Sequence, residues 1–318
     1  MRFPIKPRVL ILPHFEVGEM SGDFPGEAQY FYEHYFKNGE TLTLLSGSVA
    51  YVNADETAVL AVTGSGKTLS ALCLSTLLSD SRFDFSQAYI FAPGCAGGNY
   101  ETTVSGDICV VASVCDFDLG HFADCRDFDA KEEHTGWFRG RSYDESARVE
   151  LNAELTLKVY DLLKAYKPET TPLCEKIARK NAVRRGVVYR EPQTLIGAAL
   201  TGDSFWKGRF GHKRAIQIAR SYETKYPYAV TEMEDTAIAV TAEKFGMLSR
   251  LIILRAVVND DLIPEGQTPF SLWSGNTGYN EGVKNGETTE TADIFPTAMK
   301  NLFEAGKTVL DGILAGRL

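Results

Sequence analysis

Apolar runs of strand length alternate with stretches of helical period along this chain, and the pattern is clearest at residues 229–261. There the run LIILRAVV at 251–258, interrupted only by Arg255, predicts a central strand buried on both faces. The small and apolar residues before it recur near a 3.6-residue period, which predicts a helix that opens with the pair Met233 and Glu234 and ends at Gly246. Ligands of open α/β sheets bind at the carboxyl ends of strands, so the acids at this helix start and strand end mark a candidate site. Each acid alone is also typical of helix starts and turns.

The same patterns, read along the whole chain, predict one layered α/β domain over residues 1–318, without an internal repeat or low-complexity linker. An irregular stretch followed by two helical patterns suggests a helical insertion at about 120–185. The expected strands are 8–12, 41–46, 49–53 (a hairpin with the preceding strand), 58–62, 87–91, 107–112 and 191–199. The expected helices are 68–78, 145–167, 173–183 and 214–222, with a closing helix pair at 292–314.

Composition narrows the class of partner. A net charge of −9 argues against a nucleic-acid partner, and no run approaches the roughly 18 apolar residues of a membrane span. The apolar stretch near the N-terminus is too short for a signal sequence, so as the chain stands we expect a soluble, cytoplasmic protein, although a signal cleaved beforehand would leave the compartment open. The six cysteines lack metal-site spacing, so no metal is expected, while Cys115 and Cys125 flank a loop that could hold a disulfide.

The segment VTGSGKT at 62–68 resembles a phosphate-binding loop between a strand and a helix. The full pattern requires a glycine five residues before Gly66, and that position is Ala61. ATP binding through this loop is therefore one alternative. In the other, the glycines let the strand turn tightly into the helix and Lys67 is solvated.

Four segments that follow apolar strands carry a family resemblance: TGSGKT (63–68), PGCAGG (93–98), TGDSFW (201–206) and the EMED to VVNDD stretch (232–261). In this order they resemble the nucleoside phosphorylase superfamily, which includes the methylthioadenosine nucleosidases. The N-terminal LPHFEVGEM and PGEAQYFYEHY segments resemble, more narrowly, the purine nucleoside permease (NUP) family. The resemblance implies a three-layer α/β/α fold with a central mixed sheet, and an enzyme that cleaves the N-glycosidic bond of purine nucleosides.

The resemblance also implies roles for individual residues. Asp260 would be the general acid that protonates the leaving base, a role that burial favours by raising the pKa of a carboxyl. Glu234 would accept hydrogen bonds from the sugar hydroxyls, and Met233 would lie against the ribose. Phe205 would stack on the purine, and the main chain around Trp206 would meet the edge of the base.

Two further positions differ from the family pattern. Gly94, Cys95 and Ala96 would form a turn beneath the sugar and base, with Cys95 where the family often has serine; a buried thiol is the alternative for that residue. Asn259 replaces the serine that precedes the family's catalytic aspartate, which puts the role of that neighbour in doubt.

The loop after the first strand bears on the nucleophile. Two arginines that bind phosphate in the related phosphorylases have no counterpart here, whereas Glu16 is placed to activate water, with His14 beside it to assist or to bind an anion weakly. Hydrolysis is therefore favoured, while phosphorolysis with inorganic phosphate as co-substrate stays open and no other cofactor is expected. An ordinary solvated loop is the alternative for both residues.

A second class of function is a nucleoside-binding protein that serves purine nucleoside transport without catalysis. Long loops at 115–143 and 264–281 would close over the sugar or complete a neighbouring subunit's site. The aromatic segment at 28–36 has more aromatic residues than one buried face needs, so a homo-oligomer, at least a dimer, is expected.

Overall fold

The computed structural model describes residues 4–124, 135–263 and 290–318, and ten strands in this part of the chain form one mixed sheet. The strands are β1 (Val9–Ile11), β2 (Glu40–Thr43), β3 (Val49–Val52), β4 (Ala58–Ala61), β5 (Tyr89–Gly98), β6 (Ile108–Asp116), β9 (Arg148–Glu150), β10 (Thr194–Thr201), β11 (Tyr228–Glu232) and β12 (Leu251–Asp260). A separate hairpin joins β7 (His121–Phe122) to β8 (Trp137–Phe138).

The strand order β11-β10-β6-β12-β5-β1-β4-β3-β2 places the longest apolar strands at the centre of the sheet. β5 pairs in parallel with β1 and β12, and its last residues, Gly97 and Gly98, also pair antiparallel with β11. The sheet therefore closes on itself through β5, β12, β6, β10 and β11. Glycine at these positions fits the close approach of the strands, because a side chain at Gly98 would overlap Thr103 and Val257.

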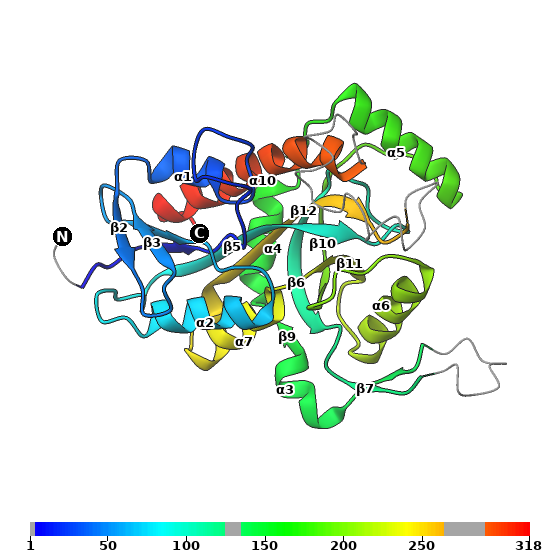
Figure 1. Ribbon diagram of the computed structural model, residues 1–318, viewed down its shortest axis with the longest axis horizontal. Helices are drawn as coiled ribbons and strands as arrows, with labels where there is room; N and C mark the ends of the chain where they lie inside the picture. The colour runs from blue at the N-terminus through cyan, green and yellow to red at the C-terminus, as the bar shows by residue number, and fades with distance from the viewer. Residues whose placement is uncertain (1–3, 125–134, 264–289) are drawn as a thin grey trace.

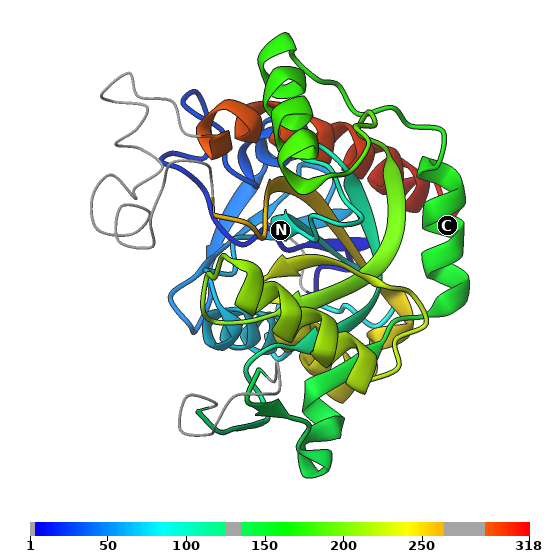
Figure 2. The same cartoon turned by 90° about the vertical axis from the view of Figure 1, so that its right-hand side faces the viewer.

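Helices cover both faces of this sheet, as Figures 1 and 2 show. One face packs against α2 (Lys67–Leu78) and α7 (Asp235–Lys244), and the other against α4 (Ala153–Leu163), α1 (Gln29–Tyr35) and the long α10 (Glu290–Leu314). The remaining helices are α3 (Asp144–Ala147), α5 (Pro172–Arg185) and α6 (Arg209–Ser221), with 3₁₀ turns at Arg141–Tyr143 and Leu248–Arg250. The architecture is the expected three-layer α/β/α fold with a central mixed sheet.

Local signals in the sequence fix several helix ends. The Asn152 side chain accepts a hydrogen bond from the main-chain N–H of Leu155 at the start of α4. The Thr171 hydroxyl does the same for Cys174 at the start of α5, where Pro172 occupies the first turn. Gly186 ends α5 at a φ of 70°, a left-handed conformation that glycine adopts without steric cost.

The segment at 120–185 is less separate from the sheet than predicted. Within it, β9 pairs antiparallel with β6, and α4 packs its apolar side on the sheet. The expected helix over 145–167 is therefore divided into α3, β9 and α4. The predicted helix pair at 292–314 is a single helix, α10, with Pro296 inside its N-terminal part.

The aromatic segment at 28–36 becomes α1, and its aromatic side chains pack inside the subunit. Phe31 and Phe36 are buried, and the Phe31 ring lies 5.3 Å from the Phe303 ring of α10. Tyr32 makes an edge contact with Tyr51 at 4.9 Å between ring centroids. The excess of aromatic residues is thus explained by the core between α1 and α10, and it gives no support to an interface.

Cys115 lies buried in β6 as a free thiol, and Cys125 lies outside the described residues. The loop 264–281 lies outside them as well. Across the described ranges, none of the helices has the length and apolar character needed to cross a membrane.

Candidate active site

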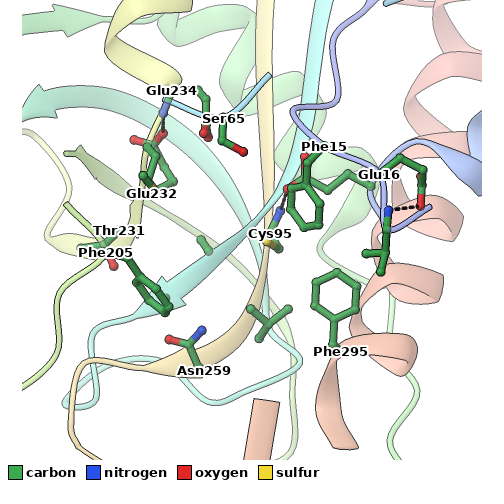
Figure 3. Close-up of a pocket in the computed structure, with 16 residues that line it drawn as sticks. Phe15, Glu16, Ser65, Cys95, Phe205, Thr231, Glu232, Glu234, Asn259 and Phe295 are labelled. Carbon is green, nitrogen blue, oxygen red and sulfur yellow. Dashed lines mark hydrogen bonds between the residues drawn. The ribbon is translucent and has the colours of Figure 1, made fainter. Parts of the chain in front are cut away.

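Strand ends from distant parts of the chain surround a cavity of about 410 Å³. β5, β11 and β12 end there, and loops after β1, β4 and β10 complete it, which is the expected location of a ligand site in such sheets. Figure 3 shows the side chains that converge on it. The lining residues are Phe15, Glu16, Val17, Glu27, Ser65, Cys95, Ala96, Gly97, Phe205, Thr231, Glu232, Met233, Glu234, Val258, Asn259 and Phe295.

Six of the predicted substrate-binding residues lie together in this cavity: Phe205, Met233, Glu234, Cys95, Ala96 and Asn259. Phe205 is about half exposed and lines the cavity. The opposite end of the cavity is aromatic, where the Phe15 and Phe295 rings lie 6.0 Å apart. The cavity therefore joins an acidic side with two apolar ends.

Glu234 lies directly before α7 and points into the cavity (Figure 3). Its Oε1 accepts a hydrogen bond from the main-chain N–H of Gly66 at 2.9 Å, so the TGSGKT loop fixes the carboxylate from the opposite side. Burial raises the pKa of Glu234, and the nearby Arg255 guanidinium opposes that rise. A charge held in this way is well placed to accept hydrogen bonds from hydroxyl groups of a ligand.

The TGSGKT loop is engaged by the chain's own carboxylates, which leaves little for a phosphate to bind. The Lys67 ammonium lies 2.9 Å from Asp116 and 3.3 Å from Asp118, and the Lys67 main-chain N–H donates to Asp203. Gly66 has a φ of 89° and begins α2, as the tight-turn interpretation requires. Lys67 is ion-paired, however, and not solvated as that interpretation assumed.

Arg255 is almost completely buried behind the cavity and joins the acids of β11 and α7. Its guanidinium lies 3.2 Å from a Glu232 oxygen, 3.4 Å from a Glu234 oxygen and in contact with Asp235. It also donates to the main-chain oxygen of Cys95 at 3.0 Å. The Arg255 cluster comprises Arg255, the acids Glu27, Glu232, Glu234 and Asp235, and His14.

The Arg255 cluster has more carboxylates than cations. Burial raises the pKa of Glu232 to about 7, with the Asp235 charge adding to the rise and Arg255 opposing it. Burial likewise raises the pKa of Asp235 to about 6, again against the effect of Arg255. One guanidinium thus faces several buried acids, and protons are gained or lost here near neutral pH.

Glu27 is one of the acids of this cluster that were not predicted from the sequence. It precedes α1, lines the cavity, and accepts hydrogen bonds of 2.7 Å from the main-chain N–H groups of His14 and Cys95. Burial raises its pKa to about 7, with Arg255 opposing and Glu234 adding to the rise. A carboxylate fixed beside a cavity with a pKa near 7 has the properties of a general base.

Glu16, the residue predicted to activate water, is directed elsewhere. Its Oε2 accepts hydrogen bonds from the N–H groups of Ala28 and Gln29, at 3.0 and 2.7 Å, and Oε1 accepts from Val17 and Gly26. Carboxylates stabilise helix starts in this way by satisfying free N–H groups. Glu16 lines the cavity, but the geometry gives its carboxylate a structural task at the start of α1.

His14 and Gly94 lie behind the cavity and do not line it. His14 Nδ1 is 2.9 Å from the Thr63 hydroxyl and Nε2 is 3.1 Å from the Arg255 guanidinium, so Nε2 accepts and Nδ1 carries the proton. Burial, and then Arg255, hold the pKa of His14 well below its usual range, which makes it a neutral support and not an anion site. A side chain at Gly94 would overlap the Arg255 guanidinium, so glycine is required there.

Asp260, the predicted general acid, is turned away from the cavity. Its carboxylate contacts Arg185 and accepts a hydrogen bond of 2.8 Å from the N–H of Leu262. The preceding residue, Asn259, lines the cavity instead. The pairing of β12 with β5 shifts in register between Val257 and Asn259, and such a shift changes which side chain faces a given side of the strand.

Trp206 packs away from the cavity, stacked on Phe117 at 5.1 Å between ring centroids. Among the described residues, no group of histidine, cysteine and acidic side chains has an arrangement able to hold a metal ion. The Cys95 thiol is half-buried beside Glu27, and desolvation raises its pKa well above the usual value, so it remains protonated.

The residues missed from the sequence are Glu27, Glu232, Asp235 and Arg255. Two signals were present: an arginine within an apolar strand requires buried acids around it, and Glu232 and Asp235 lie on either side of the Met-Glu pair. Glu27 directly precedes the aromatic helix, but sequence alone does not distinguish it from Glu16 in the same loop.

The fold and the position of the site define a three-layer α/β/α protein with a ligand cavity at the ends of its central strands. A family model described as purine nucleoside permease (NUP) matches residues 6–317, and the chain belongs to this family. No curated protein matches the sequence.

Solved structures resemble it over nearly their whole length. The chain is 16% identical to the 5′-methylthioadenosine/S-adenosylhomocysteine nucleosidase of Neisseria meningitidis, with a TM-score of 0.55 and coverage of 96% of this chain and 98% of that one. The corresponding nucleosidase of Helicobacter pylori gives 15% identity and a TM-score of 0.58, covering 98% and 99%. Futalosine hydrolase of Helicobacter pylori gives 16% identity and a TM-score of 0.58, covering 96% and 97%. At these identities the likeness concerns the fold.

Proposed function

We propose that this protein cleaves the N-glycosidic bond of purine nucleosides by hydrolysis. The observation that carries the proposal is the chemistry of the cavity. The lining residues include Glu27, Glu232 and Glu234, besides Glu16 whose carboxylate is bound at the start of α1, while no lysine, arginine or histidine is among the described lining residues. An acidic cavity favours a sugar that becomes positively charged as its bond to the base breaks, and it disfavours a bound phosphate anion.

In this proposal the substrate lies across the cavity between Phe205 and Glu234. The purine stacks on the Phe205 ring, and the sugar hydroxyls donate hydrogen bonds to Glu234, with Met233 against the ribose. The bond from C1′ to N9 breaks and its electron pair leaves with the base. The negative charges of Glu27 and Glu234 stabilise the developing positive charge on the sugar.

Glu27 supplies the nucleophile. Each of its oxygens accepts one main-chain N–H, which fixes the carboxylate and leaves other lone pairs for a water molecule. Glu27 takes a proton from that water as the oxygen attacks C1′. The departing base takes up a proton from solvent water and Glu27 later returns its own to solvent, so that ribose and neutral free base are the products. A pKa of about 7 leaves a substantial fraction of Glu27 in the basic form at neutral pH.

Phosphorolysis is the second candidate for this reaction, and the Arg255 cluster argues against it. Arg255 is the cation nearest to Glu234 in the described contacts, and its charge is already shared among Glu232, Glu234 and Asp235. A phosphate would have to displace one of these acids. A nucleoside-binding protein without turnover would use Phe205 and Glu234 in the same way but would not require a base with a pKa near 7.

The test measures free purine and sugar product from adenosine, guanosine and inosine, with and without phosphate. We expect ribose and free base in the absence of phosphate. Ribose 1-phosphate formed only with phosphate present would replace hydrolysis with phosphorolysis. Binding of the nucleosides without release of any base would favour the binding-protein alternative.

A further inference from the structure

Lys207 fixes the orientation of the Asn259 side chain at one end of the cavity. Its ammonium donates hydrogen bonds to Asn259 Oδ1 at 3.1 Å and to the main-chain oxygen of Asp260 at 2.7 Å. An ammonium group only donates, so the amide atom that faces it is the oxygen. The amide NH₂ group of Asn259 is thereby turned the other way, and Figure 3 shows its nitrogen toward the interior of the cavity.

The same lysine lies beside the residue proposed to stack on the base. Lys207 and Phe205 belong to one loop after β10, and the ammonium is 5.8 Å from the centroid of the Phe205 ring. Asn259 comes from the end of β12 and lines the same cavity as Phe205. A flat base stacked on Phe205 would therefore present one of its edges to the Asn259 amide.

We propose that the Lys207–Asn259 pair makes the site selective for 6-oxopurine nucleosides such as inosine and guanosine over adenosine. This inference rests on the proposed function and adds the substrate class. The edge of a purine that carries N7 also carries the 6-substituent. An N–H bond of the Asn259 amide can donate to the O6 acceptor of a 6-oxopurine, whereas the amino group of adenine places a donor against a donor.

The role of Lys207 is to prevent the amide from adapting. An asparagine can normally rotate its amide to accept from an amino group, but here rotation would turn the NH₂ group against an ammonium, donor against donor, and would cost the hydrogen bond between Lys207 and the amide oxygen. Sites that fix a hydrogen-bond donor in this manner discriminate strongly between ligands that differ at one polar group. The lysine also places positive charge near the base, which receives the electron pair when the C1′–N9 bond breaks. Lys207 is thus a positioning residue.

The experiment compares kcat/KM for inosine and adenosine in the wild type and in Lys207→Met, Lys207→Arg and Asn259→Asp. We expect the wild type to prefer inosine by at least about tenfold, which is a modest value for a mismatched polar group. Lys207→Met should lower the inosine-to-adenosine ratio by about tenfold because the amide can then rotate. Lys207→Arg, which keeps a cationic donor, should retain most of the preference, and Asn259→Asp should shift it toward adenosine.

Lys158→Met is the matched control, since Lys158 is exposed on α4 and pairs only with the exposed Glu154 in the described contacts. An equal rate on both nucleosides in the wild type, or a ratio that Lys207→Met leaves unchanged, would overturn the proposal. If no base is released from any nucleoside, the proposed function fails. The selectivity proposed for Lys207 and Asn259 is then tested independently by the affinities for inosine and adenosine, measured by calorimetry in the same variants. Equal affinities would then refute it.

Discussion

Glu27 combines three properties that a general base requires: a fixed position, contact with the cavity, and a pKa of about 7. Its two main-chain partners hold the carboxylate without neutralising it. Replacing it with glutamine keeps the volume of the side chain and removes the ability to accept a proton. The contribution of such a base to the rate is on the order of 10²–10⁴.

We therefore expect Glu27→Gln to lower kcat for base release by about 10²–10⁴ with little change in nucleoside affinity. In the wild type, kcat/KM should rise with pH through about 7, because only the deprotonated carboxylate accepts a proton. Steady-state rates from pH 5 to 9 check both points. Glu16→Gln serves as the control, because the Glu16 carboxylate holds the start of α1. This substitution should lower the melting temperature of the protein and leave the pH dependence of kcat/KM unchanged. A Glu27→Gln enzyme of normal activity would exclude this role.

The buried acid also affects the stability of the protein. A carboxyl whose pKa is higher in the folded than in the unfolded state contributes stability below its unfolded pKa, and that contribution is lost as pH rises through the folded value. For Glu27 the pKa rises from 4.5 to about 7, which corresponds to about 3 kcal/mol. Urea unfolding at pH 5 and pH 8 should show the wild type losing up to about 3 kcal/mol more than Glu27→Gln over this range. A difference between the two proteins that does not vary with pH would contradict this origin of the pKa shift.

At the scale of elements, the strands and helices were predicted well because their signals are local. The period of apolar residues gave α2, α5 and the long strand β12 nearly to their observed ends. Helix α10 was predicted as a pair because a proline inside a helical pattern usually ends or kinks a helix, and Pro296 lies within it. The helix predicted at 145–167 is interrupted in the structure because β9 pairs with β6, a contact between distant parts of the chain.

The site was predicted less completely because its assignments depend on single-residue register. Whether Asn259 or Asp260 faces the cavity is decided by the irregular pairing of β12 with β5, and adjacent residues of a strand point to opposite faces. Whether Glu16 or Glu27 faces it is decided by the path of one loop toward α1. Glu234 and Phe205 were placed correctly in the cavity because each lies at a strand or helix end that the pattern defines.

At the scale of the whole molecule, the homo-oligomer stays a prediction, and its basis changes. The α1 aromatics are used within the subunit, but apolar side chains remain exposed on another face. Leu69 and Leu72 of α2 are each 50% exposed, and Phe245, at the end of the adjacent α7, is 43% exposed. Large apolar side chains gathered on neighbouring helices are typical of subunit interfaces.

We expect light scattering at micromolar concentration to give at least twice the mass of 35.1 kDa. The double substitution Leu69→Glu, Leu72→Glu should shift the protein toward the monomer, because two buried charges without partners would oppose association. The matched substitution Leu157→Glu on α4, which is also partly exposed, should leave the mass unchanged. A monomeric wild type would refute the oligomer, and a dimer unaffected by the double substitution would place the interface away from α2. Helix α2, which carries Leu69 and Leu72, begins within the TGSGKT loop, and that loop donates the hydrogen bond to Glu234. Association of subunits through α2 would therefore also restrain the carboxylate proposed to bind the sugar.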